Sequence, residues 1–229
     1  MQFKQFYEQK EQKPYDDFID FLQKKGWRKI GFGAFGIVFE KLNKNYVIKV
    51  YYNDPAYDRF LDFIEQNQND PHIPKINRRI IRQPKDSRDF NYDYGVVAIE
   101  KLGKLERPRW RWDMVSMFQK FLKGVDVLNL SFDEYIDKSI KSVRQNLQED
   151  IDFYNDDPHE KYYSLSYRKL LKRLDYFVES NLGLFKTFYK FKKFLEDNNA
   201  THQFDLHSGN FMIRPSTGEI VVIDPIASY

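Results

Sequence analysis

Cysteine is absent from this chain of 229 residues, and so are long apolar runs. Without cysteine there is no disulfide framework and no thiolate chemistry, which fits a reducing compartment. No stretch of about 18 apolar residues occurs, so the sequence predicts no membrane-spanning helix. The first residues, MQFKQFYEQKEQK, lack the apolar core of a signal peptide. We therefore expect a cytoplasmic protein that does not enter a membrane.

A large excess of charge of either sign is also missing. Lys and Arg number 37 and Asp and Glu number 34, which leaves a formal net charge of +3. So small an excess argues against a dedicated nucleic-acid-binding protein, although a local basic patch stays open. Aromatic residues, by contrast, are abundant at 17%. The length suffices for one large domain or for two lobes with a substantial core.

Hydrophobic patterning predicts an α+β protein that is β-rich first and helical later. The expected helices have apolar residues on one face, at 15–25, 55–68 and most of 112–198, with breaks near 124, 155 and 183. The expected strands are β-branched or aromatic between turn residues, at 37–39, 46–50, 76–82, 94–102, 211–214 and 220–223. We predict a β-rich lobe with an N-terminal helix at 1–102, and a helical lobe ending in a β-hairpin at 103–229.

A glycine-rich segment follows the first expected helix. It reads Gly31-Phe-Gly33-Ala34-Phe-Gly36-Ile-Val38. A dinucleotide-binding fold needs a strand, then glycines, then a helix, whereas here the glycines lead into a strand. That order is typical of a kinase loop whose backbone N–H groups cover the phosphates of ATP. An ordinary glycine-rich hairpin explains the segment, taken alone, about equally well.

A lysine lies among β-branched residues in the next strand, Val47-Ile-Lys49-Val. Its ammonium group needs an anion if it points inward, and in a nucleotide site the phosphates supply one. The alternative is an edge-strand lysine that reaches solvent. Because Lys49 follows Gly31 by about the length of one hairpin, we favour phosphate binding.

Polar residues gather in the segment His202-Gln-Phe-Asp205-Leu-His207-Ser-Gly-Asn210-Phe. Asp224 follows at the end of the last apolar strand. Mg²⁺ prefers oxygen ligands and keeps several waters, so Asn210 and Asp224 are candidate metal ligands. Asp205 is then a candidate to orient an attacking hydroxyl and to accept its proton. Each of these residues alone is equally compatible with a capped turn.

Taken together and in this order, the three motifs resemble the protein-kinase-like superfamily. The resemblance implies a minimal two-lobed kinase fold that transfers phosphate from ATP with Mg²⁺. Within it, Lys49 matches the phosphate-binding strand lysine and Asp205 the catalytic-loop aspartate. Glu100 and Leu102 match the hinge whose backbone holds adenine. Asn210 and Asp224 match the metal ligands, and the nucleotide loop is matched by Gly31, Gly33, Ala34, Gly36 and Val38.

Within the superfamily, the segments FDLHSGNFM and IVVIDPIASY are most similar to the small early serine/threonine kinases of short-tailed phages. This implies phosphorylation of host proteins in the host cytoplasm. His207 stands where most protein kinases have a lysine, as it does in phage kinases and in aminoglycoside and choline phosphotransferases. It either binds phosphate when protonated or simply packs and donates hydrogen bonds. A small-molecule kinase and a non-catalytic pseudokinase that inhibits host proteins are therefore the alternatives.

Several positions depart from the kinase pattern. His202 precedes Asp205 by three residues rather than two, so we expect it to be structural. Asp224-Pro-Ile replaces Asp-Phe-Gly, and the proline makes a conformational flip of this segment unfavourable. The sequence shows no activation segment and no following helices, so we expect residues 103–200 or a partner to bind the substrate. Asp62 and Glu65 are the candidates to pair with Lys49, and a third possibility is that neither does so.

One further segment, Arg107-Pro-Arg-Trp-Arg-Trp112, interleaves arginines with tryptophans. Such residues stack on bases or bind a phosphorylated protein in some complexes. We favour the simpler interpretation that the two tryptophans pack while the arginines are solvated.

Overall fold

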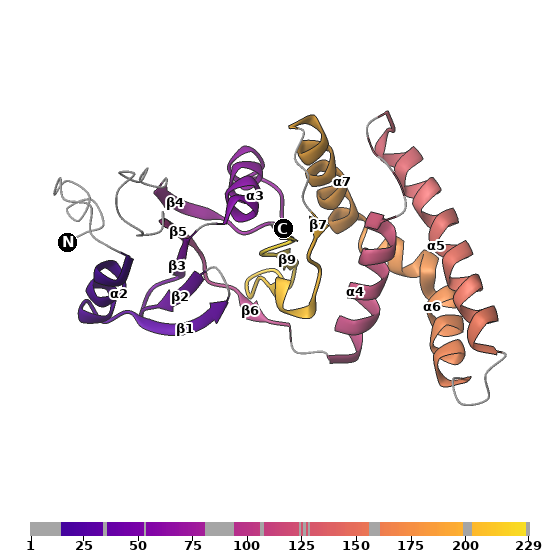
Figure 1. Cartoon of the computed structure of the whole chain (residues 1–229), viewed down its shortest axis with the longest axis horizontal. Coiled ribbons are helices and arrows are strands. Elements are labelled where there is room, and N and C mark those ends of the chain that lie inside the picture. Colours follow the sequence, from indigo (N-terminus) through magenta and orange to yellow (C-terminus); the bar gives the residue numbers. More distant parts are fainter. Residues whose placement is uncertain are drawn as a thin grey trace, which may run out of the picture. The chain divides into compact units, whose positions relative to one another are not determined.

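The computed structural model describes residues 15–33, 36–52, 54–80, 94–105, 108–123, 125, 127, 129–155, 161–198 and 203–227. It is an α+β protein (Figure 1). Its contacts divide the chain into two compact units. Unit 1 comprises residues 1–55 and 75–101, and unit 2 comprises 56–74 and 102–229.

Over the residues that the structure describes, unit 1 is an antiparallel five-stranded sheet with one helix. The strand order is β1-β2-β3-β5-β4. The elements are helix α2 (Tyr15–Lys24) and strands β1 (Arg28–Gly33), β2 (Gly36–Glu40), β3 (Tyr46–Tyr52), β4 (Ile76–Ile80) and β5 (Tyr94–Glu100). The expected turn between β2 and β3 is confirmed, because Asn43 takes up φ 60°, a left-handed conformation that asparagine tolerates.

The core of unit 1 forms because β2, β3 and β5 alternate apolar side chains between the two faces of the sheet. Phe39, Ile48 and Val50 share one face and pack in one cluster with Phe18 and Leu22 of α2. The spacing of Phe18 and Leu22, four residues apart, puts both on the same side of the helix. Amphipathic patterning thus explains why α2 covers this face.

Unit 2 is mainly helical, as the pattern predicted. Its helices are α3 (Pro55–Gln66, of which all but Pro55 lies in unit 2), α4 (Pro108–Lys123), α5 (Phe132–Asn155), α6 (Lys161–Ser180) and α7 (Leu182–Asp197). The predicted breaks near 124, 155 and 183 fall between these helices. No described helix is both long enough and apolar enough to cross a membrane.

The sequence division at residue 102 put α3 with the first part, whereas the contacts group it with unit 2. The reason is an aromatic interface between α3 and α7. The ring centroids of Phe63 and Phe191 are 4.8 Å apart, and those of Phe60 and Phe191 are 5.4 Å apart. Contacts of this kind stabilise beyond the apolar area that they bury.

The C-terminal part of unit 2 returns to short strands. Strand β6 (Gly103–Lys104) pairs with β8 (Phe211–Ile213), and β8 pairs with β9 (Ile220–Val222). A second pair joins β7 (Gln203–Phe204) to β10 (Ile226–Ala227). The predicted β8–β9 hairpin is confirmed, while β6, β7 and β10 are two residues each and too short for a pattern to indicate them.

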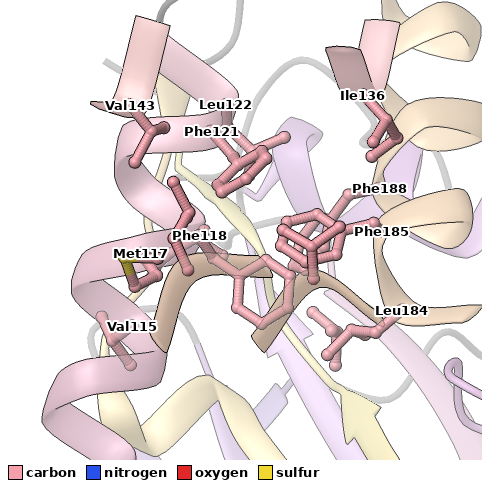
Figure 2. Packing of buried hydrophobic residues seen from close by; sticks show 14 of the residues in the cluster. Val115, Met117, Phe118, Phe121, Leu122, Ile136, Val143, Leu184, Phe185 and Phe188 are labelled. Atoms are coloured by element: carbon pink, nitrogen blue, oxygen red, sulfur yellow. The ribbon is translucent and has the colours of Figure 1, made fainter. Parts of the chain in front are cut away.

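The core of unit 2 is a cluster of aromatic and aliphatic side chains (Figure 2). Phe118 of α4 is fully buried at its centre. Its ring lies 4.5 Å from that of Phe185 and 5.1 Å from that of Phe188, both on α7. It also stacks on Phe211 of β8 at 6.0 Å. The core therefore fixes the start of β8, directly after the polar segment that ends at Asn210.

Candidate functional site

The polar segment 205–210 forms a loop between β7 and β8, and its first residue is held from both sides. The N–H of Asp205 donates to the carbonyl of Pro225 at 2.9 Å. The carbonyl of Asp205 accepts from Nδ2 of Asn210 at 2.7 Å. The carboxylate is nevertheless 53% exposed. A fixed backbone thus presents an accessible carboxylate, which is what a proton acceptor requires.

Asn210 links this loop to the segment that contains Asp224. Its side chain is buried, its N–H donates to the carbonyl of His207 at 3.0 Å, and its carbonyl accepts from the N–H of Ile223 at 3.0 Å. Asp224 is the next residue, so the register brings Asn210 and Asp224 to the same end of the β8–β9 hairpin. Because Nδ2 is engaged by Asp205, Oδ1 is the atom of this amide available as an acceptor.

His207 begins the single 3₁₀ turn, Ser208–Asn210, within the loop. Its Nδ1 accepts from the N–H of Gly209 at 3.0 Å, and its Nε2 lies 3.9 Å from Oδ2 of Asp205. Accepting at Nδ1 places the ring proton on Nε2. A Cβ on residue 209 would lie 2.8 Å from the ring of His207, so glycine permits this close approach. The hydrogen-bonding role considered for His207 is therefore present, and its role toward phosphate stays a prediction.

The loop is anchored to the core by Leu206. Its side chain is buried, and its carbonyl accepts from Nε2 of Gln119 on α4 at 2.7 Å. With Phe211 packed on Phe118, apolar residues on both sides of the turn point inward while Asp205 and His207 are exposed. The sequence did not single out Gln119, because a lone glutamine on a helix carries no pattern.

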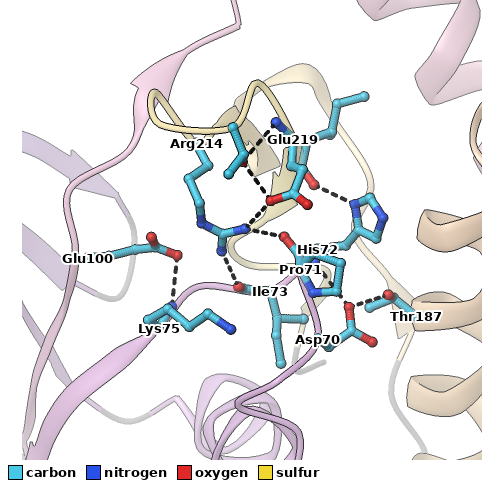
Figure 3. A network of polar contacts seen from close by, with 11 residues as sticks. Asp70, Pro71, His72, Ile73, Lys75, Glu100, Thr187, Arg214 and Glu219 are labelled. Atoms are coloured by element: carbon cyan, nitrogen blue, oxygen red, sulfur yellow. Dashed lines mark hydrogen bonds and ion pairs between the residues drawn. The ribbon is translucent and has the colours of Figure 1, made fainter.

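Strand β9 has an additional neighbour, the segment 70–73 that follows α3 (Figure 3). The N–H of Val222 donates to the carbonyl of His72 at 2.9 Å, and Nδ1 of His72 donates to the carbonyl of Ile220 at 2.9 Å. These bonds fix the open edge of the strand that leads to Asp224. No motif indicated this contact, since the partners are 148 positions apart.

Arg214, directly after β8, reinforces the same segment. Its side chain is nearly buried, with 10% of it exposed. It donates to the carbonyls of Pro71 and, at 2.9 Å, Ile73, and it pairs with Oε2 of Glu219 at 2.9 Å (Figure 3). A guanidinium group with several donors suits this task, because one side chain satisfies two backbone carbonyls and a carboxylate.

Asp70 fixes the segment to helix α7. Its carboxylate accepts from Oγ1 of Thr187 at 2.7 Å, from the N–H of His72 at 3.0 Å and from Nζ of Lys190 at 3.1 Å. Burial by itself raises the pKa of Asp70, but the hydrogen bonds from Thr187, His72 and Lys190 outweigh burial and the pKa is lowered. Asp70 therefore remains a carboxylate and holds segment 70–73 in place.

In unit 1, the register of the sheet brings several predicted nucleotide-binding residues into one row. Gly31 of β1 pairs with Val38 of β2, Val38 pairs with Lys49 of β3, and Lys49 pairs with Val97 of β5. Paired residues share a face of a sheet. Val38 and Lys49 are half-buried. The sequence spacing that suggested a common site is therefore matched by adjacency across the sheet.

Packing does not require glycine at all three positions of the predicted nucleotide loop. A Cβ on Gly36 would lie 2.7 Å from the carbonyl oxygen of Val50, so the packing of β2 against β3 requires glycine there. A Cβ on Gly31 would make only ordinary contact, and one on Gly33 would meet nothing within 4 Å. Packing therefore accounts for Gly36 and not for Gly31 or Gly33. Ala34 lies outside the described residues.

The predicted hinge has its first N–H groups engaged inside unit 1. Those of Glu100 and Lys101 donate to the carbonyls of Lys75 and Asn45, each at 2.9 Å. The carboxylate of Glu100 accepts from the N–H of Lys75 at 2.9 Å. That this segment binds adenine through its backbone stays a prediction. Since the first two N–H groups are engaged, the N–H groups that donate to adenine would begin at Leu102.

The structure does not test the following predictions. Lys49 and α3 belong to different units, so its pairing with Asp62 or Glu65 stays a prediction. His202 and the side chains of the segment Arg107–Trp112 lie outside the described residues.

The candidate metal ligands are few. Among the described residues no group of three or more histidine and acidic side chains gathers around one point. Asn210 and Asp224 contribute an amide oxygen and a carboxylate from neighbouring backbone positions. That donor set fits Mg²⁺, which usually takes one or two protein oxygens together with phosphates and water.

No protein-family model matches the sequence, and no curated protein matches it.

Proposed function

We propose that this protein is an ATP- and Mg²⁺-dependent phosphotransferase of the protein-kinase type, acting on serine or threonine hydroxyls of host proteins. The observation that carries the proposal is the loop 205–210. Its backbone is hydrogen-bonded at Asp205 to both Pro225 and Asn210, while the carboxylate of Asp205 is exposed. Asp224 follows the residue that is bonded to Asn210. Orienting a hydroxyl and binding phosphate both require a positioned carboxylate and metal ligands close together.

In the proposed reaction, Asp205 accepts a hydrogen bond from the attacking hydroxyl and takes its proton. The hydroxyl oxygen forms a bond to the γ-phosphorus of ATP, and the bond from that phosphorus to the β,γ-bridging oxygen breaks, which leaves ADP. Asn210 and Asp224 would hold Mg²⁺, which supplies positive charge that stabilises the phosphates. Lys49 binds phosphate oxygens, and the backbone between Gly31 and Gly36 covers them.

His207 would assist through position rather than by taking the proton itself. Its ring is oriented by the N–H of Gly209, so that the protonated Nε2 edge lies nearest to Asp205.

A small-molecule kinase is the second candidate, since a histidine at position 207 is equally typical of aminoglycoside and choline phosphotransferases. A pseudokinase that binds host proteins is the third. Retention of Lys49, Asp205, Asn210 and Asp224 together argues against it, because a purely binding role needs none of them.

The test is incubation of the purified protein with γ-labelled ATP, Mg²⁺ and a bacterial lysate. We expect labelled protein bands that disappear with Asp205→Ala and persist with Asp137→Ala, an exposed aspartate on α5 chosen as the matched control. Label confined to small molecules would favour the second candidate. Absence of any Asp205-dependent transfer, with a folded protein, would overturn the proposal and favour the third.

A further inference from the structure

Helix α6 carries a row of exposed side chains along one face, here called the α6 stripe. Its members are Tyr162, Leu165, Lys169, Lys172, Arg173 and Tyr176. Their spacing of three or four residues keeps them on one side of the helix. The opposite side contains the buried Ser164, Leu174 and Val178. The stripe is therefore the face of α6 that points away from the core.

The apolar members of the stripe are unusually exposed. The exposed fractions of Tyr162, Leu165 and Tyr176 are 75%, 57% and 74%. Single exposed apolar residues are common, but three along one face together form a patch. Tyr162 is also supported from the side, since its ring is 6.0 Å from that of Tyr163 in an edge-to-face arrangement. Supported aromatic rings of this kind are favoured anchors at protein interfaces.

The three cations lie between these apolar residues. Lys169, Lys172 and Arg173 make no ion pair with any other residue in the described ranges. By contrast, Arg144 of α5 is paired with Asp175 of α6, and Lys120 of α4 is paired with Asp150 of α5. Like charges three and four residues apart on a helix repel each other. An external anionic group would relieve this repulsion.

We propose that the α6 stripe binds an acidic segment of a partner protein, in which carboxylates alternate with aliphatic or aromatic residues. The carboxylates would pair with Lys169, Lys172 and Arg173, and the apolar residues would pack on Tyr162, Leu165 and Tyr176. From Tyr162 to Tyr176 the stripe is about 21 Å long at 1.5 Å per residue. A partner segment of four helical turns covers that length. This site does not depend on the proposed phosphotransferase activity.

The composition of the stripe disfavours the other occupants. A second copy packed antiparallel would bring two sets of three cations together at the centre. A nucleic acid would gain only a few phosphate contacts and would have to pass Leu165, which offers no stacking surface.

The test uses the full chain and a fluorescent peptide about 18 residues long, with leucine every third or fourth position and glutamate between. Fluorescence anisotropy should detect saturable binding that weakens as salt rises. The variant K169E/K172E/R173E should lose at least tenfold in affinity. The matched variant K141E/K186E/K193E reverses three exposed lysines on α5 and α7 and should change affinity less than twofold.

The apolar half is tested separately with Y162S/L165S/Y176S, which keeps every charge and should also lose at least tenfold. Circular dichroism confirms that each variant is helical.

The proposal is overturned if the peptide fails to bind, or if both charge-reversal variants lose affinity equally, because net charge then explains binding. It is also overturned if single-stranded DNA or phosphatidylserine vesicles bind through the stripe and the peptide does not. ATP binding is measured in parallel by calorimetric titration and is expected to be unchanged in the stripe variants, so the two proposals fail independently.

Discussion

Two groups of candidate residues, one in each unit, are built in different ways. In the loop 205–210, each residue that would act on a substrate is held by hydrogen bonds to buried or paired groups. Of the three glycines in the β1–β2 hairpin, Gly36 is required by packing, whereas a Cβ on Gly31 would make ordinary contact and one on Gly33 would meet open space. The loop is thus suited to orienting a reacting group, and the hairpin to covering a ligand with its backbone.

The loop and the hairpin also differ in how far apart along the sequence their contacting residues lie. The hairpin is a local structure, in which Gly33 pairs with Gly36. The loop depends on contacts from α4, from segment 70–73 and, through that segment, from α7. Substitutions far from the loop in sequence should therefore affect it, whereas the hairpin should respond only to changes within itself. The predictions below use this contrast.

The largest effect is expected from Asp205→Ala. Loss of a general base typically lowers a rate by about 10²–10⁴-fold. The carboxylate is half exposed, so the free energy of unfolding should hardly change. Transfer from labelled ATP and urea unfolding measure the two properties. Transfer at the wild-type rate would mean that Asp205 is not the base.

Arg214→Met should be the most damaging change to stability. It leaves the carbonyls of Pro71 and Ile73 without this donor and Glu219 without its cation, and the expected cost is about 3 kcal/mol. Arg144→Met, which breaks an exposed ion pair with Asp175, is the matched control and should cost less than about 1 kcal/mol. Urea unfolding distinguishes them. Equal losses of unfolding free energy in the two variants would show that the contacts of Arg214 with segment 70–73 stabilise the protein no more than an exposed ion pair does.

Asn210→Ala should weaken the loop itself. The buried side chain no longer donates to the carbonyl of Asp205, and such a loss costs about 1–3 kcal/mol. Hydrogen exchange of the Asp205 and Ile223 amides should accelerate, because both report on this turn. Unchanged exchange at both amides would contradict the central place of Asn210 in the loop.

For the hairpin, Gly36→Ala and Gly33→Ala form a matched pair. The first puts a Cβ against the carbonyl of Val50 and should cost about 1–3 kcal/mol through strain. The second meets nothing in the protein and should leave stability within about 0.5 kcal/mol. If the backbone covers phosphates as proposed, Gly33→Ala should still weaken ATP binding in a calorimetric titration. Neutral behaviour in both stability and ATP affinity would remove Gly33 from the site.

The smallest effect concerns acid stability. A carboxyl whose folded-state pKa is lowered stabilises the fold above its unfolded pKa, about 3.9 for aspartate, and that stabilisation is lost as pH falls through the folded value. Asp70 is such a group. Asp70→Asn should therefore lower stability at neutral pH and flatten the decline of stability below about pH 4. An unchanged acid-unfolding profile would mean that Asp70 makes no net contribution.

Much of the fold could be predicted because it follows local patterns. The helix containing Phe18 and Leu22 and the hairpin around Asn43 were expected from spacing and turn chemistry alone. The adjacency of Asp205, Asn210 and Asp224 was also expected, since a tight hairpin joins them. These features depend on residues near one another in the sequence.

The support of the site could not be predicted in this way. Arg214, Asp70 and His72 form no periodic pattern, and each acts through partners that tertiary structure alone brings near. The grouping of α3 with unit 2 has the same origin, because the contact of Phe63 with Phe191 joins distant segments. Kinase-like activity, suggested by the motifs, stays a proposal.

Segment 70–73 has a consequence for how the protein folds. Unit 2 is discontinuous, since residues 56–74 are separated from 102–229 by strands of unit 1. Strand β9 gains its edge partner only when His72 meets Ile220, a closure over 148 positions. Contacts of such long range form late and slow folding. During synthesis, segment 70–73 therefore cannot contact β9 until Ile220 and Val222 have been made, and only then is the strand that leads to Asp224 held at its edge.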